Sequence, residues 1–252
     1  PAKKEIYKHL DMNGLENILK ENAGRVKRAV VVTDGVFSMR GDFALLDRIV
    51  QLCRMFESGY EEGIITVVDD SHGIGAFGRT GRGTEEYTGA SADILIATLG
   101  KSLGVNGGYA VSTVPIIKYL RESSPFYIYS NPITPAEASA AIKSLDILGS
   151  LEGLNLLERI KELAVYLRNG LKDLGYETIS GEHPIVPLMI RDTLKTSEIV
   201  RYLFDNNILA TAINFPIVPK GEEEIRLQVS AVNTIKDIDY LLDVLKRFKG
   251  RN

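Results

Sequence analysis

A single lysine, Lys101, stands in a glycine-bracketed turn, "TLGKSLG", directly after an apolar run that ends at Leu99. An amine near the end of a buried strand can bind phosphate, pair with an acid, or form a Schiff base with a carbonyl compound. A phosphate-binding P-loop requires G-x-x-x-x-G-K-[ST], and this stretch supplies only the last three residues. The Schiff-base interpretation suits pyridoxal 5'-phosphate (PLP), whose enzymes pair such a lysine with an acid that faces the pyridinium nitrogen.

The stretch "VVDDSHGIG" supplies candidates for that acid, because it places Asp69, Asp70 and His72 at the carboxyl end of a predicted buried strand. Ligands bind at this edge in open α/β sheets. A carboxylate that leaves a buried strand needs a cation or several donors. We expect Asp69 and His72 to be functional, with Asp69 facing the PLP ring, and Asp70 to cap a structural turn. Metal binding is the rival interpretation, but without further histidines nearby the zinc signature is weak, and no metal is predicted.

A glycine pattern in the next segment could indicate a dinucleotide site. Gly73, Gly75 and Gly78 in "GIGAFG" fit G-x-G-x-x-G, and Asp93 stands near the offset of a ribose-binding acid. That fingerprint requires a helix that begins within the glycines. The following "RTGRGTEEYTG" adds three more glycines and has no apolar helical face. The sequence therefore favours a glycine-rich loop over a dinucleotide site.

Two further positions could contact a ligand. Ser38 follows a strand in "TDGVFSMRGD", where its hydroxyl could reach a bound molecule. Arg226 stands inside the apolar run "EEIRLQVSA" and needs an anion there. That anion is either a structural carboxylate or the carboxylate of a substrate, and the residues alone favour neither.

The first half of the chain alternates β-rich runs with a helical pattern. The runs 28–34 and 63–70 are rich in β-branched residues, and apolar residues recur at helical spacing over 42–57. The runs 93–99 and 108–113 extend the sheet. Continuous apolar strands are usually covered on both faces, as in a parallel sheet with crossover helices. We therefore predict an α/β fold with a mostly parallel sheet and covering helices.

Helix signals dominate after residue 130. Thr134 as N-cap, Pro135 at the first helical position and Glu137 three residues after the cap form a capping box. A second long helix is predicted over 152–175, ending at a glycine.

The remaining residues, from about 180 onward, alternate strand and helix patterns and predict a small α+β lobe. We therefore expect a partial cofactor-binding large domain over 1–145 and a C-terminal small domain over 146–252.

Composition narrows the partners. With 252 residues, 44% of them hydrophobic, the chain can bury a core, and a net charge of -3 gives no basic field for nucleic acid. No apolar run reaches the roughly 18 residues of a membrane span. Cys53 is the only cysteine and follows the buried side of its helix, so we interpret it as a core residue. These features predict a soluble, cytoplasmic protein without nucleic-acid or membrane partners.

Taken together, these stretches resemble the PLP-dependent α-oxoamine synthases of fold type I. The motifs match in order from about residue 5 to the C-terminus: "DGVFSM", "VDDSHGIGAFG", "GRG", "TLGKSLG", "GGY", "YSNPITP", "FPIVPKG" and "IRLQVSA". The resemblance implies that the sheet is part of a fold type I large domain. It also implies that Lys101 carries the cofactor and that Asp69 faces the pyridinium nitrogen.

Further roles follow from the same resemblance. His72 and Ser38 would lie at the cofactor ring and its 3'-oxygen, and Thr98 at its phosphate. Ser130 and Asn131 would reach the phosphate of a neighbouring subunit's cofactor, which implies a homodimer with a shared active site. Arg226 would bind the amino-acid carboxylate.

The implied reaction joins an amino acid to an acyl-CoA thioester. Within the family, the segments 120–148 and 215–231 look most like glycine C-acetyltransferases, which use glycine and acetyl-CoA, and next like the synthases that use alanine and pimeloyl-CoA. Family members also carry a long portion before the position that matches Pro1. We therefore keep as an alternative a non-catalytic module that cannot hold the cofactor.

Overall fold

The computed structural model describes residues 2–251, which divide into two compact units. Unit 1 contains the residues up to Val36 and Phe43–Leu151. Unit 2 contains Phe37–Asp42 and the residues from Glu152 onward. The short segment 37–42 therefore belongs with residues more than a hundred positions later in the chain.

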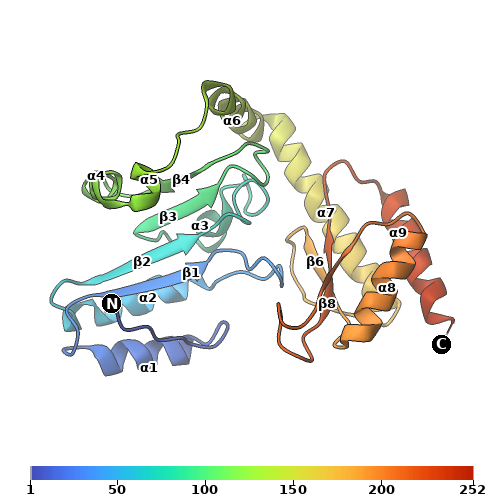
Figure 1. Cartoon of the computed structure of the whole chain (residues 1–252), viewed down its shortest axis with the longest axis horizontal. Helices are drawn as coiled ribbons and strands as arrows, with labels where there is room; N and C mark the ends of the chain where they lie inside the picture. The colour runs from blue at the N-terminus through green and yellow to red at the C-terminus, as the bar shows by residue number, and fades with distance from the viewer. Residues whose placement is uncertain (1, 252) are drawn as a thin grey trace. The chain divides into compact units, whose positions relative to one another are not determined.

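Unit 1 is built on a four-stranded sheet in the order β1-β2-β3-β4 (Figure 1). Its elements are α1 (Met12–Asn22), β1 (Ala29–Asp34), α2 (Leu46–Phe56), the 3-10 turn η1 (Glu57–Gly59), β2 (Ile64–Asp69), α3 (Gly83–Thr88), β3 (Ile94–Thr98), β4 (Gly108–Val111), α4 (Val114–Ser123), α5 (Pro125–Ile128) and α6 (Pro135–Leu148).

The first three strands are parallel and β4 is antiparallel to β3. Each predicted strand and the predicted helix over 42–57 is present, with the helix beginning at Leu46. The predicted α/β class with a mostly parallel sheet is confirmed. The helices α1 and α4 were not anticipated.

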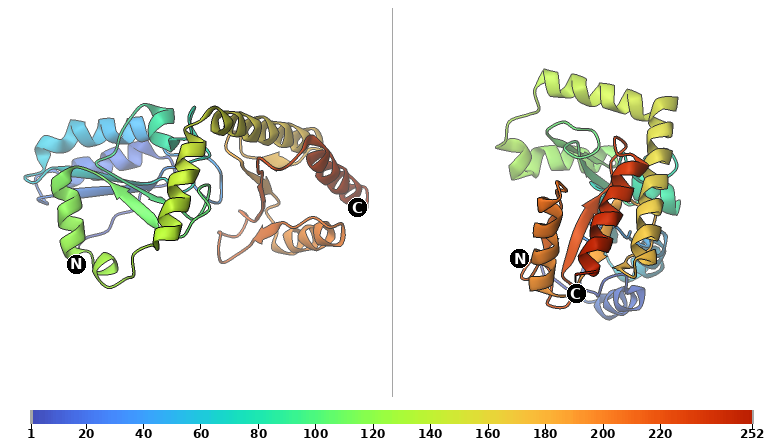
Figure 2. Two further views of the ribbon diagram at one scale, coloured as in Figure 1. Left: turned by 90° about the horizontal axis from the view of Figure 1, so that it is seen from above. Right: turned by 90° about the vertical axis from the view of Figure 1, so that its right-hand side faces the viewer.

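Helices cover one face of this sheet, where α1 and α2 lie on the same side (Figure 2). Val31, Val68 and Ala97 are buried, and α2 buries Ile49 and Cys53. On the opposite face Val30 is 55% exposed and Val32 is 62% exposed. The expectation of cover on both faces is therefore wrong for β1 as the structure describes it, because the helices α1 and α2 both pack on one side.

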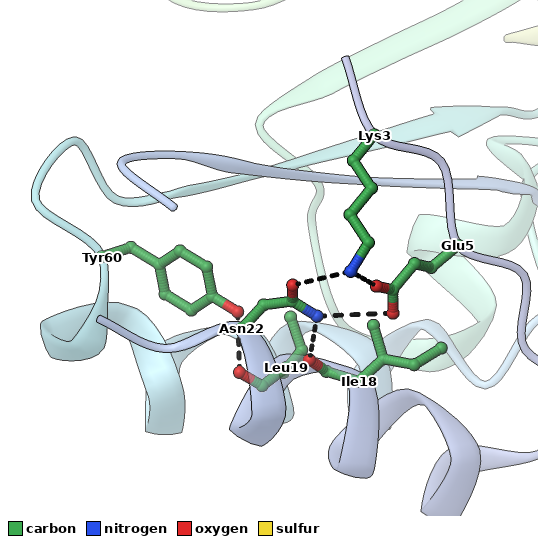
Figure 3. A network of polar contacts seen from close by, with 6 residues as sticks. All are labelled: Lys3, Glu5, Ile18, Leu19, Asn22 and Tyr60. Carbon is green, nitrogen blue, oxygen red and sulfur yellow. Dashed lines mark hydrogen bonds and ion pairs between the residues drawn. The ribbon is translucent and has the colours of Figure 1, made fainter. Parts of the chain in front are cut away.

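The segment before α1 is held on that helix by a polar network (Figure 3). Asn22 Nδ2 donates to Glu5 Oε2 at 3.3 Å and to Ile18 O at 2.9 Å. Lys3 forms an ion pair with Glu5, and Tyr60 donates its hydroxyl to Leu19 O at 2.7 Å. These contacts fix α1 against the turn that leads into β2.

Unit 2 has a four-stranded antiparallel sheet in the order β5-β6-β8-β7. Its elements are α7 (Leu151–Asp173), β5 (Glu177–Thr178), β6 (Ile185–Met189), α8 (Thr193–Asp205), β7 (Thr211–Ile213), β8 (Glu224–Gln228) and α9 (Ile235–Lys249). The three helices lie on one face of the sheet, as Figure 2 shows in yellow to red. They share one apolar core with the strand residues Val186, Leu188, Ile225 and Leu227.

The segment 37–42 is seated on the other face of this second sheet. Its Gly41 has a φ of +66°, and a Cβ there would overlap Ile185 O of β6. Arg168, 3% exposed, donates from Nη2 to His183 O and Ile185 O at 2.7 Å, which fixes the entry to β6. The close approach of two backbones explains why glycine occupies position 41.

Helix ends follow the local signals. The capping box predicted at Thr134 is present, with Thr134 N donating to Glu137 Oε2 at 2.7 Å. The long helix predicted over 152–175 is α7, and Gly175 follows it with a φ of +70°. A second capping box joins Thr234 and Asp237 at the start of α9. Over residues 2–251, every helix is too short or too polar to cross a bilayer.

Candidate functional site

Two carboxylates meet at the carboxyl edge of the unit 1 sheet. Asp34 ends β1 and Asp69 ends β2, and the two are register partners. Partners in register point to the same face, here the face on which Val30 and Val32 are exposed. Asp34 loses part of its hydration at this edge, and this partial burial raises its pKa. The Asp69 carboxylate raises the pKa of Asp34 further. The edge therefore concentrates negative charge.

The turn that carries Lys101 is pinned by hydrogen bonds on both sides. Leu99 N donates to Gly107 O at 2.9 Å, and Gly104 N donates to Lys101 O at 3.1 Å. Ser102 Oγ donates to Ile74 O at 2.5 Å. The backbone of the turn is thus fixed while the Lys101 side chain is exposed. A fixed turn with a free amine is the arrangement that covalent attachment of a ligand requires.

Lys101 lies close enough to Asp34 to act on its carboxylate. Its ammonium lowers the pKa of Asp34, opposing the effects of burial and Asp69. The sheet edge therefore brings together an amine that can condense with the PLP aldehyde and a carboxylate that can pair with its ring nitrogen. The chemistry of these groups fits PLP.

Asp70 has a structural position. It is fully buried and accepts from Thr84 N at 2.6 Å and Thr84 Oγ1 at 2.8 Å. Burial raises its pKa, and the two bonds from Thr84 oppose that rise. A Cβ at Gly73 or Gly83 would overlap its carboxylate. These contacts agree with the expectation of a structural turn.

Thr98 ends β3 and connects the turn that carries Lys101 with the segment that follows β2. Its N donates to Ser71 Oγ at 3.0 Å, and its Oγ1 accepts from Gly100 N at 3.0 Å. The hydroxyl donates to Gly107 O at 3.1 Å. Since a phosphate oxygen only accepts, the expected phosphate contact of this hydroxyl requires the bond to Gly107 to open.

The other candidates of unit 1 lie in connecting segments. His72 is half-buried in the turn that follows β2. Ser130 and Asn131 are exposed between α5 and α6. Of the predicted site residues, the structure therefore links Lys101, Asp69 and Thr98 through one sheet edge and its turns.

Ser38 and Arg226 belong to unit 2. Ser38 lies on the segment 37–42. Arg226 is half-buried on β8, and its Nη2 donates to Gln228 Oε1 at 3.3 Å. Burial lowers its pKa, and Glu224 opposes that effect. Within the described residues of unit 2, no carboxylate lies within ion-pair distance of Arg226.

The glycine-rich segment after β2 forms a loop, as expected. Helix α3 begins only at Gly83, beyond the three glycines of the G-x-G-x-x-G pattern. Asp93, the acid at the ribose offset, accepts from Thr66 N and Thr66 Oγ1 at 2.7 Å. Its carboxylate therefore holds β3 against β2. Cys53 is buried, and burial raises its pKa to about 12, as suits a core residue.

Two charged residues were missed by sequence reasoning. Asp34 ends a strand just as Asp69 does, and this shared position was the available signal. Glu224 is 2% exposed and stands two residues before Arg226 in the same strand. The sequence feature that could have indicated Glu224 is its spacing of two residues from Arg226, which places both side chains on the same face of a strand.

Comparison with known proteins extends these observations. The family model "Aminotransferase class I and II" matches residues 1–245. An 8-amino-7-oxononanoate synthase of Fervidobacterium nodosum is 38% identical over 98% of this chain. 8-Amino-7-oxononanoate synthase 2 of Bacillus subtilis is 38% identical over 94% of it.

Solved structures agree with the family model. A serine palmitoyltransferase variant from S. paucimobilis, with a bound PLP–myriocin aldimine, has a TM-score of 0.86 and 26% identity over 95% of this chain. The chain spans 61% of the Fervidobacterium relative and 59% of the palmitoyltransferase chain. The family match covers nearly all of the sequence and both units. The chain therefore belongs to the PLP-dependent aminotransferase class I and II family, with the α-oxoamine synthases as its relatives.

Proposed function

We propose that the protein acts as a PLP-dependent acyltransferase that condenses alanine with pimeloyl-CoA. The observation that carries the proposal is the sheet edge at which the ammonium of Lys101 acts on Asp34, the register partner of Asp69. The names of the relatives support the choice of substrates.

Lys101 and Asp69 would hold the cofactor. When bound, PLP supplies an electron sink for the charge that develops at the amino-acid Cα. Lys101 Nζ would take the Cα proton. Asp69 would pair with the ring nitrogen of the cofactor. His72 would donate a hydrogen bond to the thioester oxygen, which becomes negative when Cα attacks the carbonyl carbon. That oxygen returns to a carbonyl when the C–S bond breaks and CoA leaves as a thiolate.

Arg226 would bind the amino-acid carboxylate. Because no carboxylate of unit 2 forms an ion pair with it among the described residues, its guanidinium is available to an external anion. Ser38, on the segment 37–42, would bond to the 3'-oxygen of the cofactor, and Thr98 to its phosphate.

A homodimer would complete the site. Ser130 and Asn131 follow a run of exposed aromatic side chains, in which Phe126 is 89% exposed and Tyr129 is 87% exposed. Contiguous exposed apolar residues mark interaction surfaces. We expect this run to pack against a second copy and to bring Ser130 and Asn131 to the cofactor phosphate of that copy. Phe126→Asp should shift the protein toward monomer in analytical ultracentrifugation, whereas Lys118→Asp on α4 serves as a matched exposed control.

The activity is tested by thiol release from an acyl-CoA in the presence of PLP. We expect turnover with alanine and pimeloyl-CoA that is lost in Lys101→Ala. Thiol release only with glycine and acetyl-CoA would instead support the glycine C-acetyltransferase, which the segments 120–148 and 215–231 favour. A protein that takes up no PLP and turns over neither pair would support the non-catalytic module. Uptake of PLP without turnover on either pair would also contradict the proposed activity.

A further inference from the structure

Glu224 is a buried acid that the proposed reaction does not use. It is 2% exposed, and its Oε1 has no hydrogen-bond partner among the residues that the structure describes. It begins β8, where its register partners are Met189 of β6 and Ile213 of β7, which do not titrate. An ionised carboxylate at such a position lacks the donors that would replace water, so the neutral form is favoured.

The charges around Glu224 come from two elements. Arg226 lies two residues further along the same strand and therefore on the same face. The segment 37–42 contributes an ion pair, with Arg40 Nε 3.2 Å from Asp42 Oδ2. The charged groups that act on Glu224 are Arg40 and Arg226, which favour its ionised form, and Asp42 and Glu222, which disfavour it. The protonation of Glu224 therefore depends on charges from both the segment that carries Ser38 and the strand that carries Arg226.

We propose that Glu224 is a positioning residue that takes up a proton when a carboxylate binds at Arg226. This inference rests on the proposed role of Arg226. An ionised Glu224 attracts the Arg226 guanidinium and weakens its field toward an incoming carboxylate. A bound carboxylate in turn repels the ionised form of Glu224. By thermodynamic reciprocity, the proton and the ligand then favour each other's binding.

The direction of the pH effect and the pH range in which it occurs follow from the pKa of Glu224. Burial raises the pKa of Glu224 to about 7, with Arg40 and Arg226 opposing the rise. Glu224 is therefore neutral below this value and ionised above it. Carboxylate affinity should be highest on the acid side and fall as the pH rises through neutrality.

The experiment uses propionate, which has the carboxylate of the substrate but no amine that could react with the cofactor. In the full chain labelled with ¹³C at the glutamate carboxyls, saturating propionate should raise the titration midpoint of Glu224. The Kd for propionate should be about three- to tenfold weaker at about pH 8 than at about pH 6. Glu224→Gln should make this Kd independent of pH over the same range.

Glu222→Gln is the matched control, since Glu222 is exposed and lies two residues before Glu224. It should keep the pH dependence of the Kd. If propionate binds but leaves the Glu224 midpoint in place, the coupling is absent while the role of Arg226 stands. If Arg226→Gln leaves propionate affinity unchanged, the carboxylate role in the proposed function is wrong, and the coupling fails with it.

Discussion

Asp34 and Asp69 are register partners at the ends of adjacent parallel strands, and the Lys101 ammonium acts on the same edge. Two carboxylates side by side repel each other, and a nearby cation offsets part of that repulsion. Lys101 supplies part of that compensation. The amine therefore offsets part of the effect of Asp69 on Asp34.

Asp34→Asn should stabilise the cofactor-free protein at neutral pH. The folded-state pKa of Asp34 is raised, so its ionised form costs stability once the pH exceeds its unfolded value of about 3.9. The cost is small because the side chain is exposed. We expect the thermal midpoint to rise by about 1–2 °C at neutral pH and the gain to vanish in acid.

Asp146→Asn is the control for this prediction, because Asp146 is exposed on α6. Its thermal midpoint should follow that of the parent protein at every pH. A lower midpoint for Asp34→Asn at neutral pH would show that the carboxylate contributes a favourable interaction instead.

Lys101→Ala should abolish covalent cofactor attachment without unfolding the protein. The turn is held by backbone bonds and by Ser102, and the Lys101 side chain is exposed, so its removal leaves the core intact. The parent protein incubated with PLP should absorb visible light, and borohydride reduction should leave a pyridoxyl group on Lys101 by mass spectrometry. The variant should show neither signal, with an unchanged circular dichroism spectrum.

Local patterns predict much of this fold. The capping box at Thr134 and the end of α7 depend on residues within one or two turns, so the sequence displays them directly. The strands before Asp69 and Lys101 are continuous apolar runs, and adjacent parallel strands end at one edge. The meeting of these two residues at that edge follows from local pattern and general topology.

The rest depends on contacts between distant residues. The pairing of Asp34 with Asp69 requires the register of β1 and β2, which periodicity does not carry. The position of the segment 37–42 depends on the close approach of Gly41 to the backbone of Ile185, which is more than a hundred residues away in the sequence. Glu224 is 2% exposed, whereas the local run "EEEIR" indicates only a charged strand end.

Cys53 should be unreactive in the folded protein. Burial raises the pKa of its thiol to about 12, so the reactive thiolate is scarce at neutral pH. A thiol reagent such as dithionitrobenzoate should label no cysteine in native conditions and one after denaturation. Rapid labelling of the native protein would mean that α2 opens readily from the sheet.

Gly83 and Gly24 separate two effects of a glycine. Both have positive φ, +76° at Gly83 and +72° at Gly24. A Cβ at Gly24 meets nothing within 4 Å, whereas a Cβ at Gly83 would overlap Asp70 Oδ2. Gly24→Ala should therefore cost about 1 kcal/mol of unfolding free energy, the backbone cost alone.

Gly83→Ala should cost about 3 kcal/mol or more, because the new methyl displaces a buried carboxylate from its bonds to Thr84. The two variants are compared by urea unfolding. A double-mutant cycle with Asp70→Ser isolates the cause, since the shorter side chain leaves room for the methyl group. In that background the cost of Gly83→Ala should fall toward that of Gly24→Ala. An unchanged cost would place the strain in the backbone around position 83 and not at the Asp70 carboxylate.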